Sequence, residues 1–136
     1  MTDEQIENEI QAKGLTAPRV TPTDIEAEIV GEYYFTAAQG IMKAQLTSDA
    51  APNVPVEANL LTFCVLVLRN GFTVTGESAC AAPANFNAEV GQKIARQNAV
   101  QKVWPLLGFR LRDELARKLL TDADAAADLA GTPRPR

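Results

Sequence analysis

The sequence predicts an α+β domain in which a small antiparallel sheet packs against a long, kinked C-terminal helix, with a short helix near the N-terminus. Three observations support this class: an apolar run at 60–68, an Asn70-Gly71 pair that closes a hairpin, and a helical apolar repeat from 86 onward. A chain of 136 residues is long enough for one core and short for two ordinary domains. The expected parts are an acidic, partly disordered N-terminus at 1–20, a single domain at 21–120, and a flexible C-terminal tail at 121–136.

The N-terminal part has the signals of two helices and one strand. Residues 4–13 form a short, strongly charged helix candidate. A second helix is predicted at 22–31, because Thr21 can cap it and Pro22 fits the first turn. The aromatic residues at 32–36 favour an edge strand over a final helical turn, since they fit a half-buried pleated surface. A polar, proline-broken loop is expected at 42–59.

The run from Leu60 to Leu68 is the strongest strand, and it is apolar on both faces, so both faces need cover. The Asn70-Gly71 pair predicts a two-residue turn, which needs positive φ at both positions. This turn sets Val67 opposite Val74. One face of the hairpin then holds Phe63, Val65, Val67, Phe72 and Val74, and the other combines Cys64, Leu66 and Leu68 with Thr73, Thr75 and Glu77. A mixed face of this kind predicts a subunit interface, with a ligand floor as the alternative.

The segment after the hairpin predicts a long helix. Asn85 is a candidate N-cap for a helix that begins near Phe86. Small residues at Gly91, Ala95 and Ala99 recur along one side, and such a row lets a helix pack closely against a sheet or another helix. The pair Trp104-Pro105 should kink or restart the helix, because proline lacks a backbone N–H.

The composition argues against an enzyme. Histidine is absent, which removes the commonest general base and the commonest metal ligand. No glycine-rich phosphate loop marks a phosphate site. Cys64 and Cys80 lack metal-ligand spacing and are expected to be reduced. We therefore expect no catalytic residue, no metal and no cofactor.

The charge is unevenly distributed around a net value of −4. Residues 1–32 hold eight acids and two bases, whereas residues 93–118 hold seven bases and two acids. The basic stretch is either a solvated helix face balanced by the acidic segment, or an anion site. The sequence has neither a long apolar run nor an export signal, so we expect no membrane partner and a cytoplasmic protein.

Several stretches together carry a family resemblance. They are Thr21-Pro22-Thr23-Asp24-Ile25, Tyr34-Phe35-Thr36-Ala37-Ala38, the hairpin from Leu61 to Cys80, Asn85-Phe86-Asn87-Ala88-Glu89-Val90-Gly91, Ile94-Ala95-Arg96, and Lys102 to Phe109. From about residue 21 to 115 the chain resembles an uncharacterised family of small tailed-phage proteins named after "gene 49" and "gene 66" of two phages. It departs at Asn87, where the family usually shows aspartate, and at Phe109, where it often shows tyrosine. The resemblance implies a phage or prophage accessory protein, outside the virion, in the host bacterial cytoplasm.

Small phage genes of this kind often act against host defences. By analogy of size and of a sheet-plus-helix plan, this chain is similar to phage sponges, which are compact oligomers that sequester cyclic nucleotide or ADP-ribose signals without chemistry. A phosphate-rich ligand needs cationic side chains, helix-start amides and an aromatic face. The residues of these types at the hairpin tip and the helix entrance are Arg69, Phe72, Asn85, Phe86, Lys93 and Arg96.

Two other functions remain open, and both are compatible with self-association. An inhibitor of a host protein would bind through the acidic N-terminal region. A nucleic-acid accessory protein would use the basic stretch at 93–118. In each case a homo-oligomer is expected, because a strand that is apolar on both faces has only one long amphipathic helix to cover it.

Overall fold

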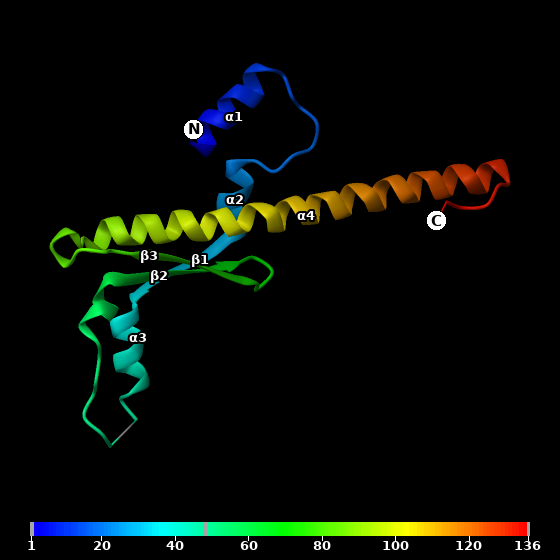
Figure 1. The fold of residues 1–136 in the computed structure, drawn as a ribbon. Helices are drawn as coiled ribbons and strands as arrows, with labels where there is room; N and C mark the ends of the chain where they lie inside the picture. The colour runs from blue at the N-terminus through cyan, green and yellow to red at the C-terminus, as the bar shows by residue number, and fades with distance from the viewer. Residues whose placement is uncertain (1, 48, 136) are drawn as a thin grey trace. The chain divides into compact units, whose positions relative to one another are not determined.

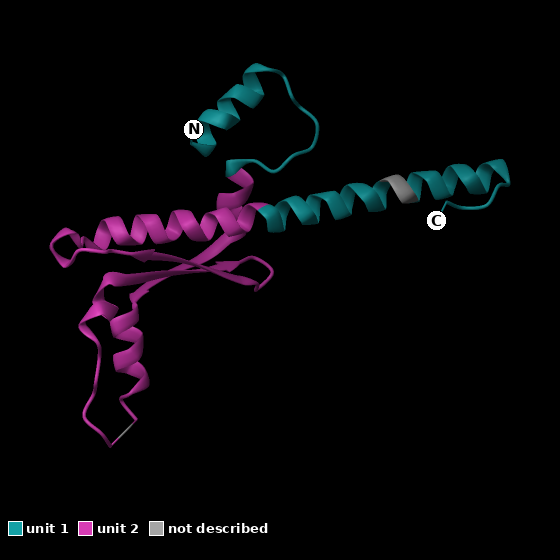
Figure 2. Ribbon diagram, in the orientation of Figure 1, with its two compact units in different colours: residues 1–22, 105–136 teal, residues 23–104 magenta. Residues whose placement is uncertain are grey.

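The fold is described from a computed structural model over residues 2–47 and 49–135, with only the backbone of 119 and 120 described. The elements in chain order are α1 (Asp3–Ala12), α2 (Pro22–Glu28), β1 (Ile29–Thr36), α3 (Ala37–Ala44), η1 (Val56–Leu60), β2 (Leu61–Leu68), β3 (Thr73–Ala79), η2 (Pro83–Asn85) and α4 (Ala88–Ala130) (Figure 1). The chain divides into two compact units, 23–104 and 1–22 with 105–136 (Figure 2). The predicted α+β class is confirmed.

The sheet of unit 23–104 is antiparallel and has the strand order β1-β2-β3. The predicted edge strand is confirmed as β1, but it begins earlier than expected. The predicted helix at 22–31 ends at Glu28, so Ile29 and Val30 belong to the strand, where Ile29 pairs with Leu68. Both residues are β-branched, and pairing with β2 suits such side chains better than a further helical turn.

The hairpin between β2 and β3 is present, but the predicted two-residue turn was wrong. The Leu68 N–H donates to the Phe72 carbonyl and the Gly71 N–H to the Leu68 carbonyl, both at 2.8 Å, so the loop has three residues. Gly71 has a φ of +88°, whereas Asn70 keeps a negative φ and accepts a hydrogen bond from the Phe72 N–H through its side chain at 3.0 Å. A three-residue loop needs only one left-handed residue, and glycine supplies it.

This change moves the register by one residue, so β3 presents the opposite side chains to each face. Leu66 pairs with Val74 and Val67 with Thr73. The face that α4 covers is the core, and its buried residues are Thr62, Cys64, Leu66, Leu68, Val74 and Gly76. The predicted core face is instead the more open one, with half-buried Phe63, Val65 and Val67 beside exposed Thr73 and Thr75.

The predicted row of small residues on α4 packs against the sheet. Gly91, Ala95 and Ala99 are all buried. A Cβ atom built on Gly76 would lie 2.1 Å from the Ala95 carbonyl oxygen and 2.3 Å from the Ala99 nitrogen. The helix backbone therefore rests directly on β3, at a distance that no side chain larger than hydrogen permits.

The start of α4 differs from the prediction by two residues. The helix begins at Ala88, and Asn87 caps it by accepting a hydrogen bond from the Val90 N–H at 3.0 Å. Asn85, the predicted N-cap, lies in η2. Of the kink or restart predicted at Trp104-Pro105, the restart is not seen, because α4 is one helix through this proline to Ala130.

The short helices α1 and α3 both begin with a capping box formed by residues close together in the sequence. The predicted helix at 4–13 is confirmed as α1, where Thr2 and Gln5 form a reciprocal capping box. The sequence analysis missed α3, although Thr36 and Gln39 form the same kind of box at its start. The loop expected at 42–59 is consequently shorter, since α3 reaches Ala44. Among the described residues no helix is long and apolar enough to cross a membrane.

Replacing Gly76 with alanine tests the close approach of α4 to β3. We expect the free energy of unfolding to fall by about 3 kcal/mol, because the new methyl group would meet helix backbone that cannot rotate away. Chemical denaturation measures this change. Gly108→Ala is the control, since a Cβ at Gly108 has no neighbour within 4 Å. Equal stability of the Gly76 and Gly108 variants would contradict the packing described here.

Candidate functional site

A cavity of about 230 Å³ lies within unit 23–104, where β3 ends and α4 begins. The start of β2, the end of β3, η2 and the first turns of α4 supply its walls. Its polar wall is made by Thr62, Ser78, Cys80, Asn85 and Asn87, and its apolar wall by Leu60, Ala79, Phe86, Val90 and Ile94. This combination of apolar surface and a few polar groups is typical of sites that bind small molecules.

Thr62 is the polar residue most deeply placed in this wall. Its side chain lies on the core face of β2 and is only 3% exposed. Across from it, Gly91 leaves room on α4, since a Cβ there would be 3.1 Å from the Thr62 hydroxyl oxygen. No hydrogen bond of that hydroxyl is found in the described part of the chain, and because no buried side-chain oxygen there lacks a partner, the hydroxyl oxygen is open to the cavity. The Cys80 thiol in the same wall donates to the Ala82 carbonyl at 3.1 Å.

The structure places two of the six predicted ligand residues at this cavity. Asn85 and Phe86 line it. Arg69 and the exposed Phe72 lie at the hairpin tip, which is the opposite end of β2 and β3. The two remaining predicted residues, Lys93 and Arg96, lie on α4 but do not line the cavity.

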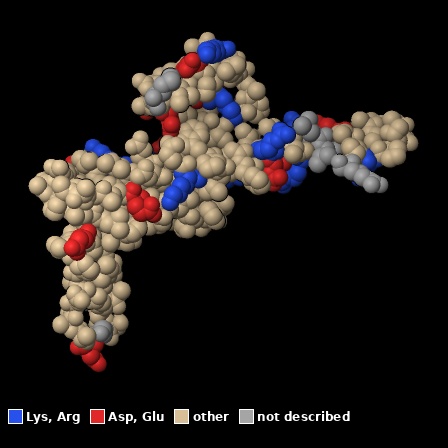
Figure 3. Space-filling model, viewed as in Figure 1, with Lys and Arg blue, Asp and Glu red and all other residues tan. Residues whose placement is uncertain are grey.

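Each predicted cation is engaged by a carboxylate. Arg69 pairs at 3.0 Å with Glu28, whose side chain is 1% exposed, and Lys93 pairs at 3.2 Å with Glu89 one helical turn away. Figure 3 shows basic and acidic side chains interspersed on one face of the molecule, with much uncharged surface around them. Each of the three predicted cations thus has its charge balanced by at least one carboxylate.

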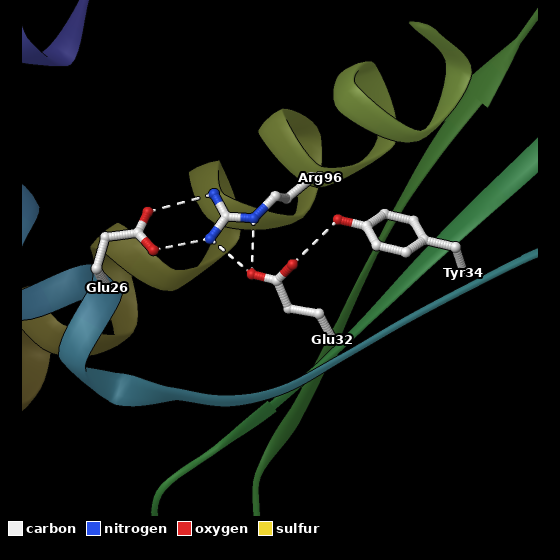
Figure 4. Close-up of polar contacts among 4 residues, drawn as sticks. All are labelled: Glu26, Glu32, Tyr34 and Arg96. Atoms are coloured by element: carbon white, nitrogen blue, oxygen red, sulfur yellow. Dashed lines mark hydrogen bonds and ion pairs between the residues drawn. The ribbon is translucent and has the colours of Figure 1, made fainter. Parts of the chain in front are cut away.

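Arg96 is the centre of an ion-pair cluster that joins three elements (Figure 4). Its guanidinium group donates two hydrogen bonds to Glu26 of α2, at 2.8 and 3.2 Å, and one from Nε to Glu32 of β1 at 2.8 Å. The Tyr34 hydroxyl donates to the second oxygen of Glu32 at 3.2 Å. With two carboxylates around one guanidinium, the cluster has a net negative charge and offers a phosphate little attraction.

The titration of these groups follows from the same contacts. The hydrogen bond from Arg96 holds the pKa of Glu32 below its ordinary value, and the hydrogen bonds with Glu32 and Glu26 raise the pKa of Arg96. Burial raises the pKa of Tyr34 to about 12, with neighbouring Cys64 and Glu32 adding to the effect, and burial also raises the pKa of the Cys64 thiol. All four groups keep their ordinary charge states at neutral pH.

A second surface of this unit is the open face of the sheet, formed by Gly31, Tyr33, Phe35, Phe63, Val65 and Val67 with Thr73, Thr75 and Glu77. Tyr33 is 61% exposed. Phe35 and Phe63 stack on this face with their ring centres 5.3 Å apart. Because β1 and β2 contribute mainly apolar side chains, this face is a candidate for contact with another protein.

Part of the cavity lining could have been predicted from the sequence. Thr62 is the one hydroxyl in the apolar run of β2, and Gly91 belongs to the small-residue row that faces it. Both cysteines are free, and the described residues hold no cluster of three metal-ligating side chains. Ser78 and Asn87 could not be assigned to the cavity, because the register and the start of α4 were each predicted one or two residues away.

Replacing Glu32 with glutamine tests the cluster around Arg96. We expect the variant to lose about 1 kcal/mol of stability near neutral pH, which is the upper range for a partly exposed ion pair. The pKa of Glu32 is lowered in the folded state, so its contribution is present above the pKa of the unfolded chain and is lost as the pH falls through the folded value. The two proteins should therefore converge once the pH falls below the lowered pKa of Glu32.

Denaturation curves between acidic and neutral pH measure this difference. Glu57→Gln is the control, because Glu57 is exposed, lies in η1 and makes no ion pair among the described residues. A Glu32 variant that shows the same pH profile as the wild type would show that the pair adds nothing to folding.

Comparison with known proteins gives one finding. The model of the Phage protein (N4 Gp49/phage Sf6 gene 66) family matches residues 20–115, which include α2, the whole sheet, the cavity and the Arg96 cluster. Comparison with curated proteins gave no significant match, and neither did comparison with solved structures. The match confirms the resemblance predicted from the sequence and covers most of the chain, so this protein belongs to the Phage protein (N4 Gp49/phage Sf6 gene 66) family.

Proposed function

We propose that this phage accessory protein acts against host defence in the host cytoplasm, by binding and sequestering a nucleotide signal without turning it over. The ligand is of the cyclic nucleotide or ADP-ribose type. The observation that supports this proposal is the cavity at the start of α4, because Asn85 and Phe86 line it and Thr62 adds a hydroxyl to its wall. An aromatic ring and neutral hydrogen-bonding groups are what a nucleoside needs for recognition.

The chemistry of the lining supports binding over turnover. The Cys80 thiol is the one titratable side chain among the described residues that line the cavity, and it is engaged by the Ala82 carbonyl. A hydrolase or transferase needs a positioned acid, base or activated nucleophile. A protein that sequesters its ligand needs only complementary shape and hydrogen bonds.

The open face of the sheet supports a homo-oligomer. Side chains such as Tyr33, Val65 and Val67 expose apolar surface that a second copy of the chain would remove from water. The face is nearly free of charge, since Glu77 is its one charged strand residue. A symmetric pair of such faces buries the same patch twice, as in a two-fold dimer.

An inhibitor of a host protein is the second candidate function, because the same open face could bind a partner instead of a second copy. The nucleic-acid alternative has less support. In the basic stretch, Lys93, Arg96 and Arg117 are each paired with a carboxylate. Charge that is already neutralised contributes little to the displacement of counterions from a nucleic acid.

The ligand proposal is tested by measuring the melting temperature of the protein with a panel of cyclic nucleotides and ADP-ribose derivatives. A ligand that binds only the folded state should raise the melting temperature in a concentration-dependent way. Phe86→Ala should reduce this shift, and Phe109→Ala should not, because Phe109 is 76% exposed and lies outside the cavity. If no compound of the panel shifts the melting temperature, the inhibitor becomes the better hypothesis.

The oligomer proposal is tested by light scattering at micromolar concentration. We expect the wild-type protein to be a dimer or larger, and Tyr33→Glu to be monomeric, because a carboxylate within an apolar interface would be desolvated without a partner. Tyr33 is already 61% exposed, so the single chain should tolerate the change. The control is Val56→Glu in η1, where the side chain is 73% exposed. A monomeric wild-type protein would refute the proposal.

A further inference from the structure

We propose that the cavity at the start of α4 recognises the uncharged base of the nucleotide, and that the phosphates remain outside it in solvent. This inference rests on the proposed function, which names the site but not the part of the ligand that enters it. It reverses the role first expected for this region, where cationic side chains were to hold phosphate.

The lining of the cavity is polar but uncharged. Four neutral side chains, Thr62, Ser78, Asn85 and Asn87, offer hydroxyl and amide groups, and none of the described lining residues is a lysine, an arginine or a carboxylate. Hydroxyl and amide groups both donate and accept hydrogen bonds. They match the mixed donors and acceptors on the edge of a purine or pyrimidine, whereas a phosphate presents acceptors only.

The Thr62 hydroxyl points to a ligand more directly than the rest of the wall. It is 3% exposed, and the side chains that follow it on the same face of β2, Cys64 and Leu66, are apolar. No buried side-chain oxygen among the described residues lacks a hydrogen-bond partner, so the Thr62 hydroxyl, which has none in the chain, is open to the cavity and available to a ligand. A polar ligand atom in the cavity would give the hydroxyl the partner that the described chain does not provide.

The size and the rim of the cavity suit a single flat ring system. Its volume of about 230 Å³ is below the range of pockets that enclose whole drug-sized ligands. Phe86 forms part of the wall, and Val90 and Ile94 stand 52% and 43% exposed on the adjacent turns of α4. A base would cover this apolar surface with its flat faces and remove it from water. A phosphate in the same place would gain no favourable contact from that surface.

The charges around the helix start give phosphates no fixed partner. Glu89 lies in the first turn of α4 and holds Lys93 at 3.2 Å, so this turn is neutral overall. Arg96, one turn farther along, is bound by Glu26 and Glu32. Phosphates outside the cavity would thus remain hydrated, and binding should depend only weakly on salt.

The experiment compares a nucleoside, its 5′-monophosphate and inorganic phosphate as ligands of the full-length chain by calorimetry. We expect the nucleoside to bind within about threefold of the nucleotide, and phosphate alone not to bind. Affinity should change little between about 50 and 200 mM salt, whereas ligands held by several charge contacts lose orders of magnitude over this range. A nucleotide that binds when its nucleoside does not would overturn this inference while leaving the proposed function intact. Absence of binding by both would overturn the two together.

Thr62→Val, which keeps the shape of the side chain and removes the hydroxyl, tests the contact itself. We expect at least about a tenfold loss of nucleoside affinity with an unchanged or raised melting temperature of the free protein. Thr73→Val is the matched control, because Thr73 is exposed on the opposite face of the sheet. If Thr62→Val fails to fold, Ser78→Ala in the same wall replaces it. Full affinity in a folded Thr62→Val or Ser78→Ala protein would overturn the inference.

Discussion

The contact of α4 with β3 at Gly76 is the constraint on which the rest of unit 23–104 depends. The helix backbone at Ala95 and Ala99 touches the sheet there, so neither the position of α4 nor its rotation about its own axis can change much. The same rotation sets Gly91 above Thr62 and turns Arg96 toward Glu26 and Glu32. One glycine in a strand thus positions both the wall of the cavity and the charged cluster, because close packing transmits the geometry along a rigid helix.

Charge in this unit joins secondary-structure elements to one another. Arg96 links α4 to α2 and β1, and Arg69 links the hairpin tip to Glu28 at the end of α2. Asn98 adds a neutral link, since its side chain donates to the Glu77 carbonyl of β3 at 2.8 Å. Side chains committed to such contacts are poorly suited to capture an anion. The uncharged cavity and the open sheet face are therefore better suited to bind a ligand or a partner.

The residues matched by the family model include the candidate site. The matched residues, 20–115, contain the sheet, the cavity and the charged cluster, and they leave out α1 and the end of α4. The ligand recognition proposed above requires a stable frame and a shaped surface. The sheet with its closely packed helix is the stable frame, and the cavity at the start of α4 is the shaped surface.

Local patterns in the sequence determined the α+β class, the hairpin, the edge strand at 32–36, the helix at 4–13 and the small-residue row, because periodicity and capping are properties of neighbouring residues. Asn85 and Phe86, which line the cavity, were singled out in the same way. Only the tertiary structure decided the hairpin register, since both a two-residue and a three-residue loop suit Asn70-Gly71, and it alone brought Arg96 to Glu26 and Glu32 from 70 and 64 residues away. Contacts across such distances depend on how the helix lies on the sheet, which no local pattern encodes.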